Sequence, residues 1–138
     1  MKKIIVTGSC GFIGFNLINS LSDTYKIIGI DSLNNAYDNN LKKLRLDKLT
    51  NLTNFEFKNI NFSKESDLVE NNEIFNNCTA IVHLGARAGV RQSFADPEKY
   101  LIDNTLGTSN LSLKVKEFEI PRFIPVSYTH LTLPTKQM

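Results

Sequence analysis

The stretch Val6-Thr7-Gly8-Ser9-Cys10-Gly11-Phe12-Ile13-Gly14 decides the fold that this chain is expected to adopt. Residues 2–6 in front of it end in an apolar, β-branched run, which predicts a buried parallel strand. Residues 15–21 behind it repeat apolar side chains at helical spacing. A strand, glycines at every third position and a helix N-terminus together predict a site for the phosphates of a dinucleotide. The alternative is a tight turn that is glycine-rich without binding a ligand.

An acidic residue follows at the distance that such a site requires. Residues 25–31 form a second predicted strand, and it ends in Asp31, about twenty residues past the glycines. A carboxylate here suits the ribose hydroxyls of NAD and would repel the 2′-phosphate of NADP. Asp31 therefore predicts a preference for NAD. The alternative is an aspartate at a strand end that caps a turn.

Strands and helices continue to alternate along the chain, which predicts an α/β fold with right-handed crossovers. We expect a Rossmann-like, doubly wound parallel sheet in the order 3-2-1-4-5, truncated after about the fifth strand, with ligands at the carboxyl ends of strands 1 and 4. The further elements expected are a loop at 32–40, a helix at 41–49 whose basic residues form a solvated face, a strand at 54–60, a helix from Ser63 with Leu68, Val69, Ile74 and Phe75 on its apolar face, a strand at 80–84, a helix from Asp96-Pro97-Glu98 to about Phe118, and a strand from 122.

Composition excludes several classes of protein. The 138 residues suffice for one domain or part of one, and 41% hydrophobic with 22% charged residues is typical of a globular protein. A net charge of +2 gives no indication of nucleic acid or of an anionic membrane surface. Cys10 and Cys78 have no metal-ligand spacing, so we expect no metal and a reducing, cytoplasmic setting. The Met-Lys-Lys start resembles a signal peptide, but the glycines interrupt its apolar segment and no run is long enough to span a membrane.

These residues resemble the extended short-chain dehydrogenase/reductases, within them the NAD-dependent epimerase/dehydratase family. The segment from Thr7 to Gly14 matches the family signature TGxxGxxG, which is more specific than a lone GxGxxG. The segments Tyr37-Asp38-Asn39-Asn40-Leu41-Lys42 and Ala88-Gly89-Val90-Arg91-Gln92-Ser93 look most like UDP-glucuronate 4-epimerases. The resemblance covers about residues 2–125, an N-terminal fragment of such an enzyme.

The resemblance implies a role for individual residues in cofactor binding. Asn61 stands where the family usually has an aspartate for the adenine, and an amide oxygen can still accept that hydrogen bond. Arg91 resembles a residue at the sugar-nucleotide end of the cleft, with a surface arginine as the alternative. His83 is interpreted as a structural histidine. The implied contacts are Gly8, Gly11, Phe12, Ile13 and Gly14 for the pyrophosphate, Asp31, Ser32 and Asn35 for the adenosine ribose, Asn61 with Phe62 beside it for the adenine, and Leu84, Gly85, Ala86 and Asn104 for the nicotinamide side.

The resemblance also implies an activity. An enzyme of this kind removes a hydride from C4 of a nucleotide sugar with its bound NAD and returns it to the other face. A UDP-sugar is the expected substrate, and the parent enzyme is expected to be a homodimer. The alternatives are a UDP-glucose 4-epimerase, a nucleotide-sugar 4,6-dehydratase, or a catalytically inactive NAD-binding fragment.

The end of the chain departs from the family. The resembled enzymes carry a Tyr-x-x-x-Lys pair after the fifth strand, in which the tyrosine is the acid/base. Tyr128 is followed four places later by Thr132, so no catalytic residue is assigned here. Residues 126–138 resemble the translation of a transposon-end sequencing adapter, with a divergent natural terminus as the alternative. We expect residues 1–125 to be a partial NAD-binding Rossmann domain, residues 126–138 to be a non-native tail, and the substrate domain to be absent.

The coding sequence provides a direct test of this interpretation. We expect an independently amplified genomic copy, read past codon 125, to continue into a serine-rich turn and a Tyr-x-x-x-Lys pair. A stop codon at the present end would contradict this expectation and would leave a module without its acid/base.

Overall fold

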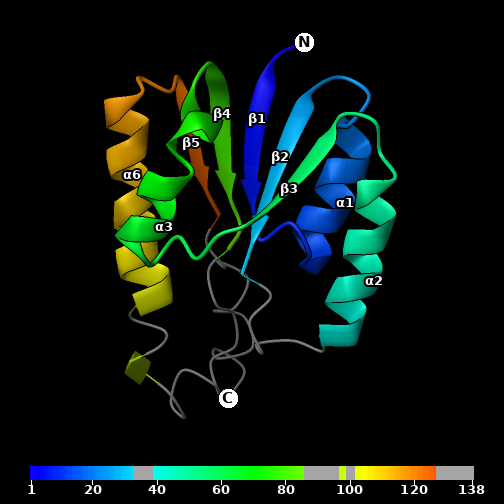
Figure 1. The fold of residues 1–138 in the computed structure, drawn as a ribbon, viewed down its shortest axis with the longest axis horizontal. Coiled ribbons are helices and arrows are strands. Elements are labelled where there is room, and N and C mark those ends of the chain that lie inside the picture. Colours follow the sequence, from blue (N-terminus) through cyan, green and yellow to red (C-terminus); the bar gives the residue numbers. More distant parts are fainter. Residues whose placement is uncertain (33–38, 86–96, 99–101, 127–138) are drawn as a thin grey trace, which may run out of the picture.

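The computed structural model describes residues 1–32, 39–85, 97–98 and 102–126, which form a parallel α/β sheet structure. The sheet has the order β3-β2-β1-β4-β5, and each neighbouring pair is parallel. All five arrows in Figure 1 therefore point toward one end of the molecule. This topology confirms the predicted strand order. The elements are β1 (Lys3–Thr7), α1 (Phe12–Leu21), β2 (Lys26–Asp31), α2 (Asn39–Thr50), β3 (Phe55–Asn59), α3 (Glu65–Glu70), the 3-10 helix η1 (Asn72–Phe75), β4 (Cys78–His83), the π-helix η2 (Ile102–Leu106), α6 (Gly107–Glu117) and β5 (Arg122–Pro125).

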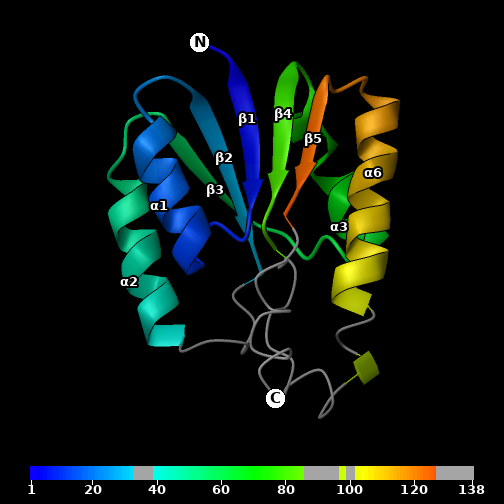
Figure 2. The same cartoon turned by 180° about the vertical axis from the view of Figure 1, so that it is seen from behind.

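Helices cover both faces of the sheet, as its apolar strands require. Successive side chains of a strand point to opposite faces, so Ile5 of β1 joins one buried cluster whereas Ile4 joins the other. The cluster around Ile4 includes Ile18 of α1 and Leu49 of α2. Figures 1 and 2 show α1 and α2 on one flank and α3 and α6 on the opposite flank. The central strand is consequently buried on both sides.

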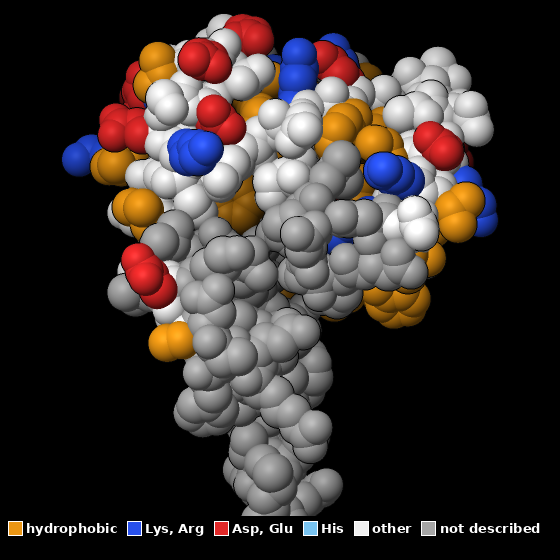
Figure 3. All heavy atoms as spheres, turned by 60° about the horizontal axis from the view of Figure 1, so that its bottom comes forward, with side chains coloured by type: hydrophobic (Ala, Val, Ile, Leu, Met, Phe, Trp, Pro, Cys, Tyr) orange, Lys and Arg blue, Asp and Glu red, His pale blue; other side chains and the backbone are white. Residues whose placement is uncertain are grey.

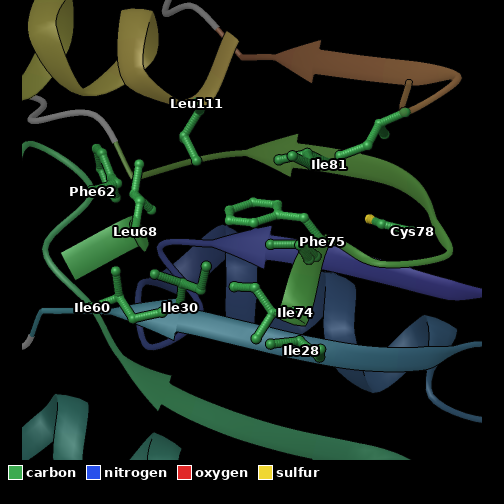
Figure 4. Close-up of a cluster of buried hydrophobic side chains, with 12 residues drawn as sticks. Ile28, Ile30, Ile60, Phe62, Leu68, Ile74, Phe75, Cys78, Ile81 and Leu111 are labelled. Atoms are coloured by element: carbon green, nitrogen blue, oxygen red, sulfur yellow. The ribbon is translucent and has the colours of Figure 1, made fainter. Parts of the chain in front are cut away.

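The second cluster shows where helix prediction from periodicity was wrong. Phe75 and Ile74 are buried in this cluster with Leu68 of α3 (Figure 4), but both come from η1 rather than from a continued α3. Val69 was expected on the same apolar face and is instead 54% exposed. Because α3 ends at Glu70 and the chain tightens into a 3-10 turn, the phase of the side chains changes between Leu68 and Ile74.

The helical segment before β5 begins as a π-helix and continues as an α-helix. Residues 102–106 form the π-helix η2, and α6 follows directly from Gly107. Leu111 of α6 is fully buried against the sheet, whereas Leu106 is exposed. The expected helix start at Asp96 lies outside the described residues. π-helical turns are rare and are frequently found at functional sites.

Candidate cofactor-binding site

The predicted site residues gather at the carboxyl ends of four adjacent strands. Gly8 follows β1, Asp31 ends β2, Asn61 follows β3, and Leu84 with Gly85 follows β4. The register pairs Thr7 with both Ile30 and His83, so these strand ends are level with one another. Asn35, Ala86 and Arg91 lie outside the described residues, and their predicted roles stay predictions.

The glycine turn is held by the end of β2 and leaves no room for side chains. The N–H groups of Gly8 and Ser9 donate to the Ile30 carbonyl at 2.8 and 3.2 Å. Gly8 has a φ of +72°, and a Cβ there would lie 2.7 Å from the Leu84 carbonyl oxygen. A Cβ on Gly14 would lie 2.2 Å from the Gly8 carbonyl oxygen. The first and third glycines therefore let α1 and β4 approach the turn at backbone distance.

Helix α1 begins beside this turn with a terminus suited to an anion. Its N-cap is Gly11, no side chain caps it, and its first turn carries no acidic residue. The first N–H groups of a helix have no acceptor within that helix. They carry the positive end of the helix dipole, which favours phosphate. Phe12 and Ile13 at this terminus are exposed.

Asp31 is buried and paired with a lysine of α2. The residue is 5% exposed, and its carboxylate accepts from the Cys10 N–H at 3.1 Å through Oδ2. Lys42 Nζ lies 3.4 Å from Oδ1 and is 4% exposed as a residue. The expectation that the basic residues of this helix form a solvated face was therefore wrong for Lys42. Leu49 is fully buried, and its spacing of two helical turns from Lys42 is the sequence signal that places both on the inner face.

Arg45 lies on the other side of Cys10. Its guanidinium donates to the Cys10 carbonyl at 3.2 Å and stands 5.9 Å from the centroid of the Phe12 ring. Burial, followed by the nearby Asp31 charge, raises the pKa of the Cys10 thiol to about 11. This thiol is therefore protonated near neutral pH and unreactive. Cys10 is therefore a small buried residue of the glycine turn rather than a reactive thiol.

His83 joins β1, β4 and α6 through a buried chain of hydrogen bonds. Thr108 Oγ1 donates to the Asn104 carbonyl at 2.8 Å, so it accepts from His83 Nε2 at 3.0 Å. His83 Nδ1 then accepts from the Thr7 hydroxyl at 2.7 Å. Burial lowers the pKa of His83 to about 4, which keeps the ring neutral at physiological pH. The ring is thus a structural histidine, as expected, with its tautomer set by its neighbours.

Asn61, Phe62 and Asn104 have structural partners in the described residues. Asn61 Oδ1 accepts from the Ser63 N–H at 3.0 Å, which makes a tight turn after β3. The Phe62 ring fills the space beside two glycines, because a Cβ on Gly85 or Gly107 would lie 2.6 or 2.5 Å from it. Contacts of Asn61, Phe62, Asn104 and Ser32 with a cofactor stay predictions.

Charge is unevenly distributed around this end of the molecule. Figure 3 shows acidic side chains mainly over the flank of α3 and α6. Helix α2 on the other flank carries Lys42, Lys43, Arg45 and Lys48 with Asp47 as its acidic residue. Across the described ranges, no cluster of three or more His, Cys, Asp or Glu side chains is arranged to hold a metal ion. No helix among the described residues has the length and apolar character needed to cross a membrane.

The sheet order, the glycine turn and the uncapped α1 terminus define the class of the protein as a Rossmann-like α/β domain. Comparison with known proteins makes the assignment specific. The chain matches the NAD dependent epimerase/dehydratase family over residues 4–131 and belongs to that family.

Individual relatives agree with this membership. An uncharacterized protein of Methanocaldococcus jannaschii is 46% identical over 132 residues, covering 91% of this chain and 39% of that protein. A UDP-glucuronate 4-epimerase of Thermodesulfobacterium geofontis is 38% identical over 131 residues, covering 92% of this chain and 39% of that enzyme. A crystal structure of a variant UDP-glucuronic acid 4-epimerase from Bacillus cereus, in complex with a fluorinated UDP-glucuronic acid and NAD, matches with a TM-score of 0.82 and 30% identity over 91% of this chain and 40% of that chain. The chain thus spans about two fifths of the length of these relatives.

Gly14 and Gly11 form a matched pair for a stability test, because a Cβ would strike backbone at Gly14 much more closely than at Gly11. We expect Gly14→Ala to lower the free energy of unfolding by about 3 kcal/mol or more, because its methyl group meets backbone that cannot move away. Gly11→Ala is the control, since its Cβ would lie 3.2 Å from the Gly8 carbonyl oxygen and its φ of −75° suits alanine. We expect a loss of about 1 kcal/mol or less there. Urea denaturation measures both, and equal losses would contradict the packing described for Gly14.

Burial of His83 makes stability depend on pH. Its pKa falls from 6.5 to about 4 on folding, so the unfolded chain binds the proton more readily. As far as His83 is concerned, the free energy of unfolding is highest above pH 6.5 and decreases as the pH falls toward 4. Between pH 7 and pH 5 we expect the free energy of unfolding to drop by about 2 kcal/mol more than in His83→Gln, which cannot titrate. Parallel curves for both proteins in urea denaturation at the two pH values would refute this expectation.

Proposed function

We propose that this chain is the NAD-binding part of a nucleotide-sugar epimerase of the UDP-glucuronate 4-epimerase type. The observation that carries the proposal is the alignment of the glycine turn, the α1 N-terminus and Asp31 at one end of the sheet. The 38% identity to the Thermodesulfobacterium geofontis enzyme supports the choice of reaction. Because the chain corresponds to about two fifths of such enzymes, the activity is proposed for the whole enzyme.

The residues present fit NAD. The turn places Gly8 where a side chain would strike the end of β4, which leaves the backbone itself as the surface offered to a pyrophosphate. The uncapped terminus of α1 supplies N–H donors and no competing carboxylate. Asp31 is held by the Cys10 N–H and by Lys42 at the end of β2. A carboxylate at this position accepts hydrogen bonds from an unphosphorylated ribose.

Each part of this site has a distinct task in the proposed enzyme. Bound NAD supplies a hydride acceptor and donor for the C4 position of the sugar. Gly8, Gly11 and Gly14 with the α1 terminus bind the pyrophosphate, and Asp31 orients the adenosine ribose. Thr7 fixes the Leu84 and Gly85 backbone by accepting both N–H groups at 2.9 Å, so the β4 end presents a rigid wall toward the nicotinamide side.

The substrate, its contact, the oligomeric state and the source of the acid/base are proposed as well. We propose a UDP-sugar as substrate, because the similar Bacillus cereus structure contains a UDP-glucuronic acid derivative. Arg91 is its proposed contact, and the enzyme is proposed to act as a homodimer in the cytoplasm. The acid/base is proposed to come from polypeptide that corresponds to the unmatched part of the relatives, and residues 126–138 are proposed to be non-native.

Binding and catalysis are tested separately. Calorimetric titration of the chain with NAD⁺ is expected to show one saturable site, with NADP⁺ bound at least about tenfold more weakly because Asp31 opposes its phosphate. Circular dichroism establishes that the titrated protein is folded. A folded chain that does not bind NAD⁺ would contradict the proposal.

The reaction itself requires the complete enzyme. UDP-glucuronate and NAD⁺ incubated with it are expected to yield UDP-galacturonate without net consumption of NAD⁺. A 4-keto-6-deoxy product would indicate a dehydratase instead, and conversion of UDP-glucose alone would indicate the other epimerase class. UDP-glucuronate incubated without enzyme is the control for spontaneous change.

A further inference from the structure

The π-helix η2 lies toward the end of the sheet where the proposed cofactor site is. Helix α6 runs back from it along the sheet, and Figure 1 shows the yellow, N-terminal end of this helical segment toward the end of the molecule to which the arrowheads point. A dinucleotide in this fold spans the point where the strand order reverses, with one nucleotide on each side. Because Asp31 at the end of β2 is proposed to orient the adenosine ribose, the nicotinamide half is expected toward β4 and β5, the strands that η2 and α6 connect.

The π-turn determines which side chains of η2 face that end of the molecule. Each carbonyl of a π-helix is bonded to the N–H five residues further on, so a π-turn holds one residue more than an α-turn. One extra residue rotates the preceding residues by about 100° relative to the same chain continued as an α-helix. Such turns are rare, which indicates that the α-helical form is ordinarily favoured. The orientation of Ile102–Leu106 therefore depends on the contacts that hold the turn in its π form.

A chain of hydrogen bonds from the strand ends reaches this turn. Thr108 Oγ1 donates to the Asn104 carbonyl at 2.8 Å, and a hydroxyl bonded to the carbonyl four residues back is a contact that bends helices. The His83 ring, 2% exposed, donates from Nε2 to the same Thr108 oxygen at 3.0 Å and accepts from Thr7 at Nδ1. Every proton in this chain thus points from Thr7 toward the turn.

Packing holds the junction between η2 and α6 as well. Gly107 is the first residue of α6, and a Cβ there would lie 2.5 Å from the Phe62 ring. That ring lies edge-on to His83, with the ring centroids 5.1 Å apart. Asn110 donates from Nδ2 to the Phe62 carbonyl at 3.0 Å. The helix just after the π-turn is therefore fixed against the end of β4 and against the segment that follows β3.

We propose that His83 and Thr108 are positioning residues for the nicotinamide half of the dinucleotide. Their hydrogen bond holds the π-turn of η2 at the carboxyl end of β4 and so sets which of its side chains face the bound cofactor. This inference rests on the proposed NAD site. Both residues act through the backbone of η2, because their polar atoms are engaged with each other, with Thr7 and with the Asn104 carbonyl. A purely structural role would instead affect both halves of the dinucleotide alike.

The test compares NAD⁺ with ADP in calorimetric titrations of the chain. ADP carries the adenosine and the pyrophosphate but lacks the nicotinamide half. Thr108→Val keeps the size of the side chain and removes its hydroxyl. We expect it to raise the Kd for NAD⁺ about fivefold, as loss of one side-chain hydrogen bond predicts, while the Kd for ADP stays within about twofold of the wild-type value. Thr108→Ser keeps the hydroxyl and is expected to retain the wild-type affinity for NAD⁺.

Ser112 offers a matched control on the same helix. Its hydroxyl donates to the Thr108 carbonyl at 2.9 Å, again four residues back, but Ser112 is exposed and both residues lie within α6. Ser112→Ala therefore removes the same kind of bond and leaves the His83 chain in place. We expect this variant to bind NAD⁺ and ADP as the wild type does. Circular dichroism and thermal melting of each variant identify any that fails to fold.

A measurement on the His83 ring itself covers the case in which Thr108→Val does not fold. The chain has two histidines, so His130→Gln leaves His83 as the only one. Nitrogen NMR of this ring is expected to show the proton on Nε2. Saturating NAD⁺ is expected to shift the Nε2 resonance, whereas ADP leaves it in place, because only the nicotinamide half meets the turn that His83 supports.

The outcomes separate this inference from the proposed function. A folded wild-type chain that does not bind NAD⁺ overturns the proposed function and this inference with it. A chain that binds NAD⁺, with a folded Thr108→Val variant that binds it equally well, overturns the present inference alone. Equal losses for NAD⁺ and ADP also overturn it, because they indicate a purely structural role. If Thr108→Val does not fold, a His83 resonance that NAD⁺ leaves unchanged, or that ADP shifts equally, overturns the inference.

Discussion

The Thr7 hydroxyl, at the end of the central strand, joins the two strand ends between which the candidate site lies. Its oxygen accepts from the N–H groups of Leu84 and Gly85, each at 2.9 Å, and its proton goes to His83 Nδ1. No water is needed to satisfy these groups, and the His83 ring is neutral because burial lowers its pKa to about 4. The Thr7 side chain therefore fixes the end of β4 relative to the glycine turn. That turn begins at Gly8, directly after Thr7.

Packing at the same place requires glycine on three elements. Gly8 touches the backbone of Leu84, and Gly85 and Gly107 make room for the Phe62 ring. The ring in turn lies edge-on to His83 with its centroid 5.1 Å away, so the polar chain is enclosed by apolar surface. Enclosure of this kind strengthens hydrogen bonds and penalises any charge on the imidazole. The glycine turn and the β4 end thus share one support.

Much of this arrangement could be predicted from the sequence, because local patterns determine it. The alternation of apolar runs with helical periods gives the strand order through the rules of parallel sheets, and the glycine spacing gives the turn. The exposure of Val69 could not be predicted in the same way. The exposure of Val69 follows from the end of α3 and the change to a 3-10 turn, which depends on how the chain packs rather than on periodicity. The tautomer of His83 depends on its two partners, Thr7 and Thr108. These residues are distant from His83 and from each other in the sequence, so no local pattern brings them together.

Lys42 illustrates how tertiary packing determines chemistry that a single residue type does not reveal. Read alone, a lysine among other basic residues on a polar helix indicates a solvated face, and three of its neighbours on α2 (Lys43, Leu44 and Lys48) are indeed exposed. Leu49 is fully buried against α1 and the sheet, so the residue two turns before it must also face inward. On this inner face the Lys42 ammonium group pairs with the Asp31 carboxylate. Asp31 is in register with Asn59 on the adjacent strand β3. The surroundings of Asp31 therefore cannot be understood from β2 alone, because the helix that follows β2 supplies the cation beside its carboxylate.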